Sequence, residues 1–431
     1  MSARSGQCAL IILVLCGGCA TYTDTVRGVY QAADAGDYRT GLDRVNKILK
    51  VENCEQMPEK WTGRRSLAVL ERAVLLQATG QYRWSARDLS AAEAELELLD
   101  LDPDAGGKIG KYIYSDSAEA YKTPPTERLA ISALNMLNYL ATDDLQGAAV
   151  EARRFTVSRN YLESLDKAAH GAFGSYLAGF IFEKLGEPER ALRYYEETRG
   201  AGDLQALREP TLRLSGHADD GGPEPAGADA DGEILVVLGL GRVPYKMPKR
   251  IPVGLAVTLA GPGLAGDPKV LAALALKMIV YPELVVRDNL AENATVSLDG
   301  RDVPVELVTD LGNEVTREYD SMKPKIIASA LTRLIARAAA AEAARRLPRK
   351  AEDSTRSLAA LATEAALLSL DKPDTRSWTL LPAHVCIARA RVRPGRHELH
   401  IDLRGKIQQT RSVPVDVPPG GFRVAAIIEP R

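Results

Sequence analysis

The sequence predicts an α+β protein with more than one domain, in which an array of helices over 19–214 precedes a β-rich domain over 233–431. Three observations lead to this prediction. Apolar residues recur at helical spacing between turn signals in the first half. Almost no large apolar residue occurs over 215–232. Alternating or fully apolar short runs, bounded by glycine and proline, then fill the second half.

The first residues have the three parts of a secretory signal peptide: a basic start, an apolar run over 8–16, and small residues before Cys19. The run is too short to span a bilayer. Two glycines followed by Cys19 resemble the lipobox of bacterial lipoproteins, which predicts removal of 1–18 and acylation of Cys19. Ala20, in place of an aspartate, favours outer-membrane sorting, so we expect a lipid-anchored protein facing the periplasm. An ordinary secretory signal with incidental cysteines remains the alternative.

Composition narrows the function classes. Removal of the leader takes away one arginine, so the net charge of the remaining chain is about −3. This near-neutral balance gives no reason to expect nucleic acid as a partner. Cys54 and Cys386 are the remaining thiols, and a disulfide between them is an alternative in an oxidising compartment. Two separate thiols are the favoured interpretation, because the cysteines fall in different predicted domains.

Four turn signals divide the helical region into helix pairs. A small residue, which allows close approach of the second helix, follows each turn at Gly41, Ser85, Ala148 or Ala191. The turns are Gly36-Asp37-Tyr38, Gly80-Gln81-Tyr82, Asp143-Asp144-Leu145 and Gly186-Glu187-Pro188. The last unit resembles the tetratricopeptide-repeat pattern in Gly179, Phe182, Gly186, Pro188, Ala191 and Tyr195. The spacing of the turns is irregular, and a general helical bundle is the alternative.

The segment 215–232 cannot bury enough surface to offset its ordering entropy, which predicts a disordered linker. Beyond it, a sandwich-like β domain is expected, with a helical hairpin inserted at about 323–370. Pro244 and Pro248 predict an extended stretch that cannot complete a ladder. Its strands are predicted at 233–241, 253–260, 278–287, 294–298, 303–308, 385–392, 398–403, 411–417 and 422–428, and its helices at 323–347 and 357–370.

No motif predicts catalysis, a cofactor or a metal. The stretch over 238–241, LGLG, lacks both a third glycine and a following helix, so it has no anion-binding helix terminus. His384 and Cys386 share one face of a predicted strand, and a thiol–imidazole pair there is the less favoured alternative to a structural histidine beside a buried thiol. We therefore expect a protein that is not an enzyme.

Two groups of arginines are candidates for binding a partner. Arg153 and Arg154 follow a turn in the helical array, whose concave faces commonly hold peptides. Arg333 and Arg337 lie in a basic helix predicted over 323–347, whose opposite face is apolar. For both groups, a solvated helix face is the competing interpretation, and the basic helix either contacts a membrane or packs on its own domain.

Several segments together resemble a family of uncharacterised bacterial lipoproteins with tetratricopeptide-like repeats. The resemblance covers nearly the whole mature chain and implies envelope location, but it implies no activity and no catalytic residue. The segments that carry it are Cys19, 36–38, 150–154 (VEARR), 236–253 (VVLGLGRVPYKMPKRIPV), the helix start at 325–327 and 374–378 (DTRSW) leading into 381–382.

The expected function is a membrane-anchored scaffold that binds an envelope protein through its helical repeats. The alternative is a glycan- or peptidoglycan-binding accessory factor for envelope assembly, with the β domain as the binding module. Sugar binding favours exposed aromatic side chains, and only Trp378, Tyr281 and Phe422 are candidates in that domain.

Overall fold

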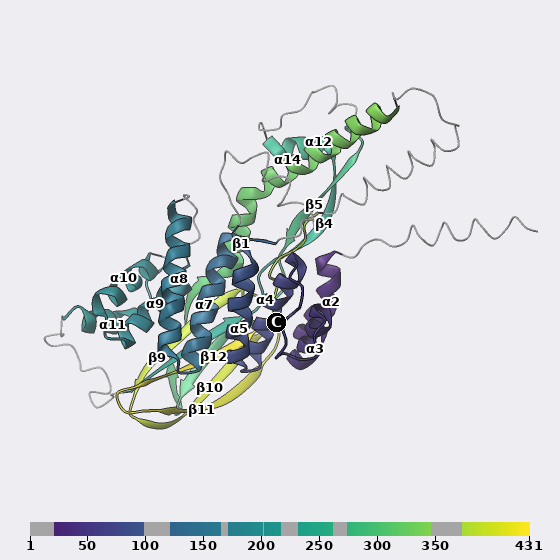
Figure 1. Cartoon of the computed structure of the whole chain (residues 1–431). Coiled ribbons are helices and arrows are strands. Elements are labelled where there is room, and N and C mark those ends of the chain that lie inside the picture. Colours follow the sequence, from purple (N-terminus) through teal and green to yellow (C-terminus); the bar gives the residue numbers. More distant parts are fainter. Residues whose placement is uncertain are drawn as a thin grey trace, which may run out of the picture.

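The computed structural model describes residues 21–98, 121–164, 171–200, 202–216, 232–261, 274–345 and 373–431. Helices make up the N-terminal half, and strands in mostly antiparallel sheets make up most of the C-terminal half. Figure 1 shows a layer of helices lying over the strands, and an arm that projects away from both. The predicted α+β class is confirmed.

The N-terminal helices come in consecutive pairs, and each pair packs on the next: α3 on α4, α5 on α7, and α8 on α9. A short 3₁₀ turn (Gln205–Leu207) and α11 (Arg208–Leu214) follow the last pair. Two short parallel strands, β1 (Glu97–Leu98) and β2 (Lys122–Thr123), lie between the second pair and the third. The paired helices are α2 (Tyr22–Asp34) with α3 (Tyr38–Leu49), α4 (Gly63–Ala78) with α5 (Tyr82–Glu95), α7 (Pro125–Ala141) with α8 (Leu145–Ser164), and α9 (Ala172–Lys184) with α10 (Pro188–Arg199).

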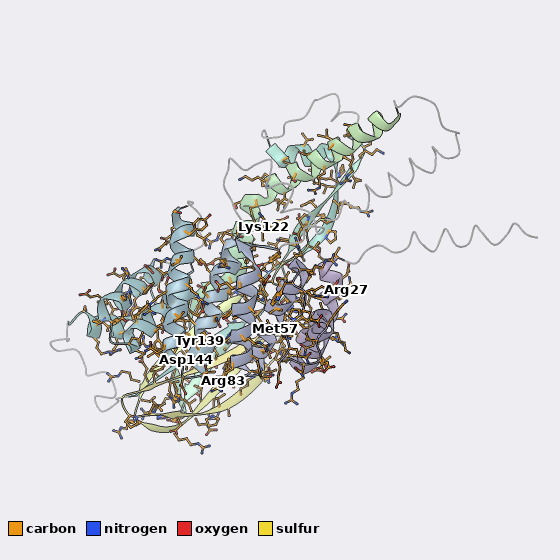
Figure 2. All side chains as sticks on the ribbon, in the orientation of Figure 1. Arg27, Met57, Arg83, Lys122, Tyr139 and Asp144 are labelled. Carbon is orange, nitrogen blue, oxygen red and sulfur yellow. The ribbon has the colours of Figure 1, made fainter. Side chains whose placement is uncertain are left out.

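All four predicted turns have the same backbone geometry. The second residue after each first helix is left-handed, at φ 72° for Gly36, 74° for Gly80, 60° for Asp143 and 75° for Gly186. Its N–H bonds back three residues, and the next N–H bonds back five, which is the Schellman arrangement for ending a helix. In the third turn the second bond joins Asp144 to Tyr139 at 2.8 Å, and Figure 2 shows both side chains near the sheet.

Two four-stranded sheets form the rest of the main body. In the first, β12 runs parallel to β3, and the order is β12-β3-β9-β8; the second is antiparallel throughout, in the order β11-β10-β6-β7. The strands are β3 (Gly232–Leu240), β6 (Ala291–Leu298), β7 (Arg301–Val303), β8 (Glu306–Asp310), β9 (His384–Val392), β10 (Gly395–Gly405), β11 (Gln409–Val417) and β12 (Phe422–Glu429).

Strand β3 is buried along its whole length because helices cover one of its faces and the second sheet covers the other. Leu235 and Val237 belong to the large hydrophobic cluster that contains the helices. Ile234 and Val236 point the other way, into a cluster shared with β10 and β11 of the second sheet. Successive side chains of a strand alternate between its faces, so this nine-residue apolar run joins three layers. The helices and the first sheet therefore share one core.

The predicted hairpin turn is present, but the strand after it divides. Asp299 and Gly300 have φ 50° and 77°, as a two-residue hairpin turn requires. The predicted strand 303–308 becomes β7, which pairs with β6, and β8, which pairs with β9 in the other sheet. Pro304 lies between them and lacks the N–H that a continuing ladder would use, so the chain crosses between sheets there.

The arm consists of β4 (Tyr245–Pro252), α12 (Val253–Ala260), β5 (Met278–Val285) and most of α14 (Leu311–Arg345). Its small hydrophobic cluster is separate from those of the body and includes Ile251, Ile279, Tyr281, Ile327 and Leu331. Figure 1 shows α12, β4, β5 and the far half of α14 extending together beyond the helical layer.

Three predictions for this region were wrong. Residues 253–260 form a helix rather than a strand, because Val253, Ala256 and Ala260 pack at helical spacing on the arm. The stretch with Pro248 does complete a ladder with β5, in which Pro248 lies opposite Pro282. A two-stranded ribbon has free outer edges, where a missing N–H costs no ladder bond.

The long helix also begins earlier than predicted, at Leu311 rather than near 323. Pro324 lies within it, and this proline made a helix start near 323 the natural expectation. The predicted helix 357–370 and residues 217–231 of the predicted linker lie outside the described residues.

Candidate functional site

The predicted lipid-bearing residue, Cys19, lies outside the described residues, but the structure describes the helix that follows it, α2. Thr21 caps α2 through a reciprocal pair of bonds with Asp24. The Thr23 hydroxyl donates to the carbonyl oxygen of Lys246 at 3.2 Å. Lys246 lies at the start of β4, so the chain that leaves Cys19 enters the body at the base of the arm.

Arg153 and Arg154 project from α8 within a stripe of exposed apolar side chains. Val150 and Tyr161 are each 46% exposed and Val157 is 70% exposed. With these spacings, the five side chains fall within about one third of the helix circumference. Large apolar side chains exposed together on one helix mark an interaction surface more strongly than the arginines alone.

The two arginines differ in their electrostatic surroundings. Arg154 forms an ion pair with Glu151 at 2.8 Å, and the Glu151 side chain is only 2% exposed. Burial raises the pKa of Glu151, and Arg154 counteracts that rise. Arg153 is exposed and has no ion-pair partner among the residues that the structure describes. Arg153 therefore supplies the free positive charge of the stripe.

Arg333 and Arg337 lie in the part of α14 that belongs to the arm, far along the chain from the α8 stripe. Both are half-buried, and Arg333 donates to the Ser329 hydroxyl at 3.1 Å. The apolar face predicted for this helix, with Ile327 and Leu331, packs inside the arm. The structure does not bring these arginines together with Arg153 and Arg154 in one site.

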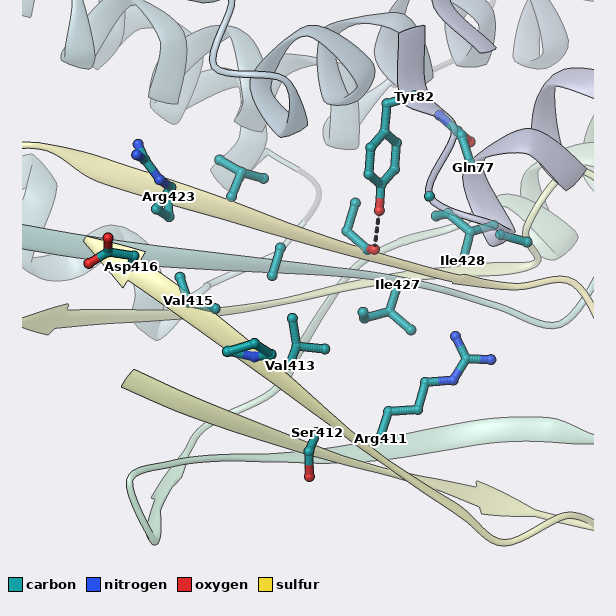
Figure 3. Close-up of a pocket in the computed structure, with 16 residues that line it drawn as sticks. Gln77, Tyr82, Arg411, Ser412, Val413, Val415, Asp416, Arg423, Ile427 and Ile428 are labelled. Atoms are coloured by element: carbon teal, nitrogen blue, oxygen red, sulfur yellow. Dashed lines mark hydrogen bonds between the residues drawn. The ribbon is translucent and has the colours of Figure 1, made fainter. Parts of the chain in front are cut away.

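A groove lies where the edge strands β11 and β12 meet the α4–α5 turn (Figure 3). Its volume is about 610 Å³, and Val413, Val415 and Ile427 form part of its wall. The Tyr82 side chain also lines the groove, and its hydroxyl donates to the Ala426 carbonyl oxygen at 2.7 Å.

Both strand edges at this groove are protected against an added strand. On β12, the odd-numbered residues from Gly421 to Glu429 form the ladder to β3, so the backbone N–H and C=O of Ala426 point to the free edge. The Tyr82 hydroxyl already donates to that Ala426 carbonyl oxygen. On β11, the pairing of Leu399 with Val413 turns Pro414 outward, and proline has no N–H to offer. The groove is therefore a poor site for a peptide that binds by strand addition.

A buried ion-pair network joins the last helix pair to the first sheet. Arg389 of β9 contacts Glu183 of α9 at 2.7 Å and also pairs with Glu233 of β3, and each of these side chains is at most 8% exposed. Burial opposes ionisation of Glu183, but the Arg389 guanidinium outweighs it and holds the pKa of that carboxyl below its usual range. This network holds the interface between α9 and the first sheet together.

Glu71 and Glu127 are buried carboxylates that sequence reasoning missed. Both accept hydrogen bonds from the buried coil 373–383. Glu71 accepts from the N–H groups of Thr379 and Leu380, and Glu127 accepts from the N–H of Trp378. Burial raises the pKa of Glu71 to about 7. The signal available in the sequence was a lone acid within an apolar helical stretch (LAVLERAVLL over 67–76).

These carboxylates explain how a coil can lie inside the protein. Buried backbone N–H groups need acceptors, and the coil belongs to neither sheet, although Ala383 at its end donates to the Leu240 carbonyl oxygen of β3. Glu71 and Glu127 take that role, so their perturbed pKa values follow from a structural task.

The described residues contain no cluster of three or more His, Cys, Asp or Glu side chains that could hold a metal. Cys54 and Cys386 are free thiols. Burial raises the pKa of Cys386 to about 11, and the His384 imidazole lies 3.8 Å from the carboxylate of Asp310. These surroundings do not generate a reactive thiolate.

Within the described ranges, no helix combines the length and the apolar character that crossing a membrane requires. Comparisons of the chain with protein-family models, with curated proteins and with solved structures find no significant match.

Proposed function

We propose that the protein is a lipoprotein, anchored through Cys19 in the outer membrane and facing the periplasm, that acts as a scaffold for an envelope protein and performs no catalysis. The observation that carries this proposal is the α8 stripe: Val150, Val157 and Tyr161 with Arg153 and Arg154. The other exposed large apolar side chains of the main body are dispersed over α5, α11 and β8, where Trp84, Leu212 and Leu307 lie on separate elements.

The helix pairs support this proposal as units of the tetratricopeptide type. In the last pair a Cβ on Gly179 would lie 2.5 Å from the Tyr195 ring, so the small–aromatic contact of that pattern requires glycine. Ser85, Ala148 and Ala191 are fully buried at the equivalent position of the second helix. The shared cluster between the two sheets likewise supports a sandwich for the β-rich part.

The stripe favours a particular kind of partner. A helix that exposes apolar and basic side chains together is complementary to an amphipathic segment with an acidic residue beside its apolar face. Because Glu151 already neutralises Arg154, we expect the acidic group of the partner to pair with Arg153.

Site-specific photo-crosslinking in the host tests this proposal. A photoreactive residue at Val157 is expected to give a discrete adduct with one envelope protein, and the same residue at Arg83 of α5 (labelled in Figure 2) serves as the control position. The substitution Arg153→Glu should reduce the Val157 adduct about tenfold, since charge reversal places like charges together. Absence of any adduct specific to Val157 would contradict the scaffold proposal.

Glycan binding is less well supported, because its candidate aromatic side chains are not free. Trp378 and Tyr281 are 0% and 2% exposed. Phe422 packs edge-to-face on Phe180, with ring centroids 5.3 Å apart. A buried ring cannot stack on a sugar.

The anchor itself has a direct test. Cys19→Ser should release the protein from the membrane fraction, and mass spectrometry of the native protein should show an acylated N-terminal cysteine at position 19. An uncleaved leader, or an unmodified thiol at Cys19, would remove the anchor from the proposal.

A further inference from the structure

The apolar side chains exposed on the arm form a second candidate surface, distinct from the α8 stripe. Among the described residues, they all belong to the stretch of β4, α12 and β5, and none comes from α14. They are Met247, Leu255, Leu259, Leu276, Met278 and, just after β5, Val286. By the register of the β4–β5 ribbon, Met278 lies on the face of Arg250, and Met247 lies on the other face, with Ile251. Large apolar side chains exposed on one projecting element indicate a candidate binding surface.

Helix α12 shows how this surface is arranged. Its inner side chains, Val253, Ala256 and Ala260, pack in the small cluster of the arm. Leu255 and Leu259, four residues apart on the opposite side, are 48% and 39% exposed. The helix carries no charged side chain, so it has apolar residues both inside and outside.

Basic side chains surround the patch. Lys249 and Arg250 of β4 and Lys277 before β5 are all exposed. The one carboxylate in the described part of 245–286 is Glu283, which already pairs with Lys249 at 3.2 Å and with Lys323 of α14 at 3.3 Å. Arg250 and Lys277 therefore leave the apolar patch with a positive rim.

The arm begins where the chain from the predicted anchor enters the body. Thr23 contacts Lys246 at the base of β4, and Cys19 is only four residues earlier, within about 14 Å of extended chain. The eight residues of β4 extend the arm by about 26 Å. A bilayer holding the acyl chains would thus lie within about 14 Å of the base of the arm.

We propose that the arm lies on an anionic phospholipid surface, with Leu255, Leu259 and Met278 in the headgroup region and Arg250 and Lys277 paired with lipid phosphates. Apolar side chains combined with a basic rim are the composition of interfacial segments. A second copy of the chain is a poorer occupant, since a symmetric contact would place the two positive rims together. This inference does not depend on the α8 partner.

Vesicle flotation of the full mature chain with Cys19→Ser tests the proposal without help from acyl chains. The protein is expected to float with vesicles of phosphatidylcholine and phosphatidylglycerol and not with phosphatidylcholine alone. Leu255→Asp with Leu259→Asp should weaken vesicle binding about tenfold, and Arg250→Glu with Lys277→Glu should do the same. Leu212→Asp with Leu307→Asp, at equally exposed positions in the body, is the matched control.

The outcomes separate the possible occupants. Unchanged vesicle binding in both arm variants, or no binding by the parent chain, would overturn the proposal. So would sedimentation showing a dimer that dissociates only in the Leu255 and Leu259 variant, because that result would identify a second copy as the occupant. Loss of the α8 crosslink with intact vesicle binding would leave the arm inference standing while the scaffold proposal failed.

Discussion

The body and the arm of this molecule bury their side chains in different ways. In the body, helices and strands share a continuous core, and the charged groups inside it, such as Arg389 and Glu71, have partners from distant parts of the chain. The arm has a small separate cluster and exposes leucine and methionine side chains. The body therefore buries its apolar side chains within itself, whereas the arm presents a surface suited to contact with another molecule.

Helix α14 connects the two regions. Near its start, the Glu318 carboxylate accepts bonds from the N–H and hydroxyl of Thr126, at the beginning of α7. One residue later, the Tyr319 hydroxyl bonds to the Pro282 carbonyl of β5 in the arm. Tyr319 belongs to the arm cluster, and so do Ile326, Ile327, Ala330 and Leu331 beyond Pro324. One helix therefore carries both the attachment to the body and the core of the arm.

The largest effect is expected for Arg389→Met in the body. This change removes the buried guanidinium that Glu183 and Glu233 share and leaves the two carboxylates with the more exposed Lys184, which costs about 3–5 kcal/mol. Urea unfolding should show the loss in the free energy of unfolding. Arg83→Met on the surface should stay within about 0.5 kcal/mol, and a similarly small effect of Arg389→Met would contradict the view that the body depends on this network.

Ile327→Ala tests whether the arm unfolds independently. Truncating this fully buried side chain should cost about 2–4 kcal/mol, but within the arm cluster alone. Hydrogen exchange should therefore speed up in 245–261, 278–285 and 311–331 and remain slow in α4 and α7. Equal loss of protection in α4 would show that arm and body unfold together.

The pH dependence of stability should report on the buried coil of the body. Burial raises the pKa of Glu71 from 4.5 to about 7, so its ionisation opposes folding. The contribution of Glu71 to stability is complete below about pH 4.5, falls as the pH rises and is lost above about pH 7, on the order of 2–3 kcal/mol. In Glu71→Gln this decline should be smaller by that amount, as measured by urea unfolding between pH 5 and 8 in steps of about one unit. A part of the decline should remain, because burial also raises the pKa values of Glu314 and Glu318 to about 7. If the free energy of unfolding of the variant depended on pH as that of the parent does, the titrating group would not be Glu71.

The smallest effect is expected at the exposed face of the arm. Leu255→Asp with Leu259→Asp should change the free energy of unfolding by no more than about 0.5 kcal/mol, because both side chains are already largely in water. Thermal unfolding of the purified variant checks this. A large loss in the free energy of unfolding would mean that these leucines stabilise the arm and are not a surface for another molecule.

Local signals predicted much of the fold. The four helix-pair turns follow from glycine or aspartate in a left-handed conformation, and the hairpin at Asp299-Gly300 from the same requirement. The strands β3, β5, β9, β11 and β12 were placed within a few residues of their observed bounds. The apolar run over 253–260 was assigned to a strand, because a short apolar segment does not distinguish the two periods when its neighbours are unknown.

The candidate site was predicted only in part. The sequence indicated Arg153 and Arg154, but the apolar side chains that make them part of a surface became visible with the exposed face of α8. For α14 the sequence left open whether the helix packs on its own domain, and its apolar face does so. The exposed patch of the arm went unnoticed, since apolar residues in a sequence are expected to be buried.

The sequence by itself determined the turns, most of the helix and strand positions and the charge pattern, because each of these depends on residues that are near neighbours along the chain. Only the tertiary structure decided that the helices and the first sheet share a core, that Glu71 serves a coil more than 300 residues away, and which leucines remain in water. Burial and pairing depend on which distant surfaces meet, and that choice reflects the packing of the whole chain.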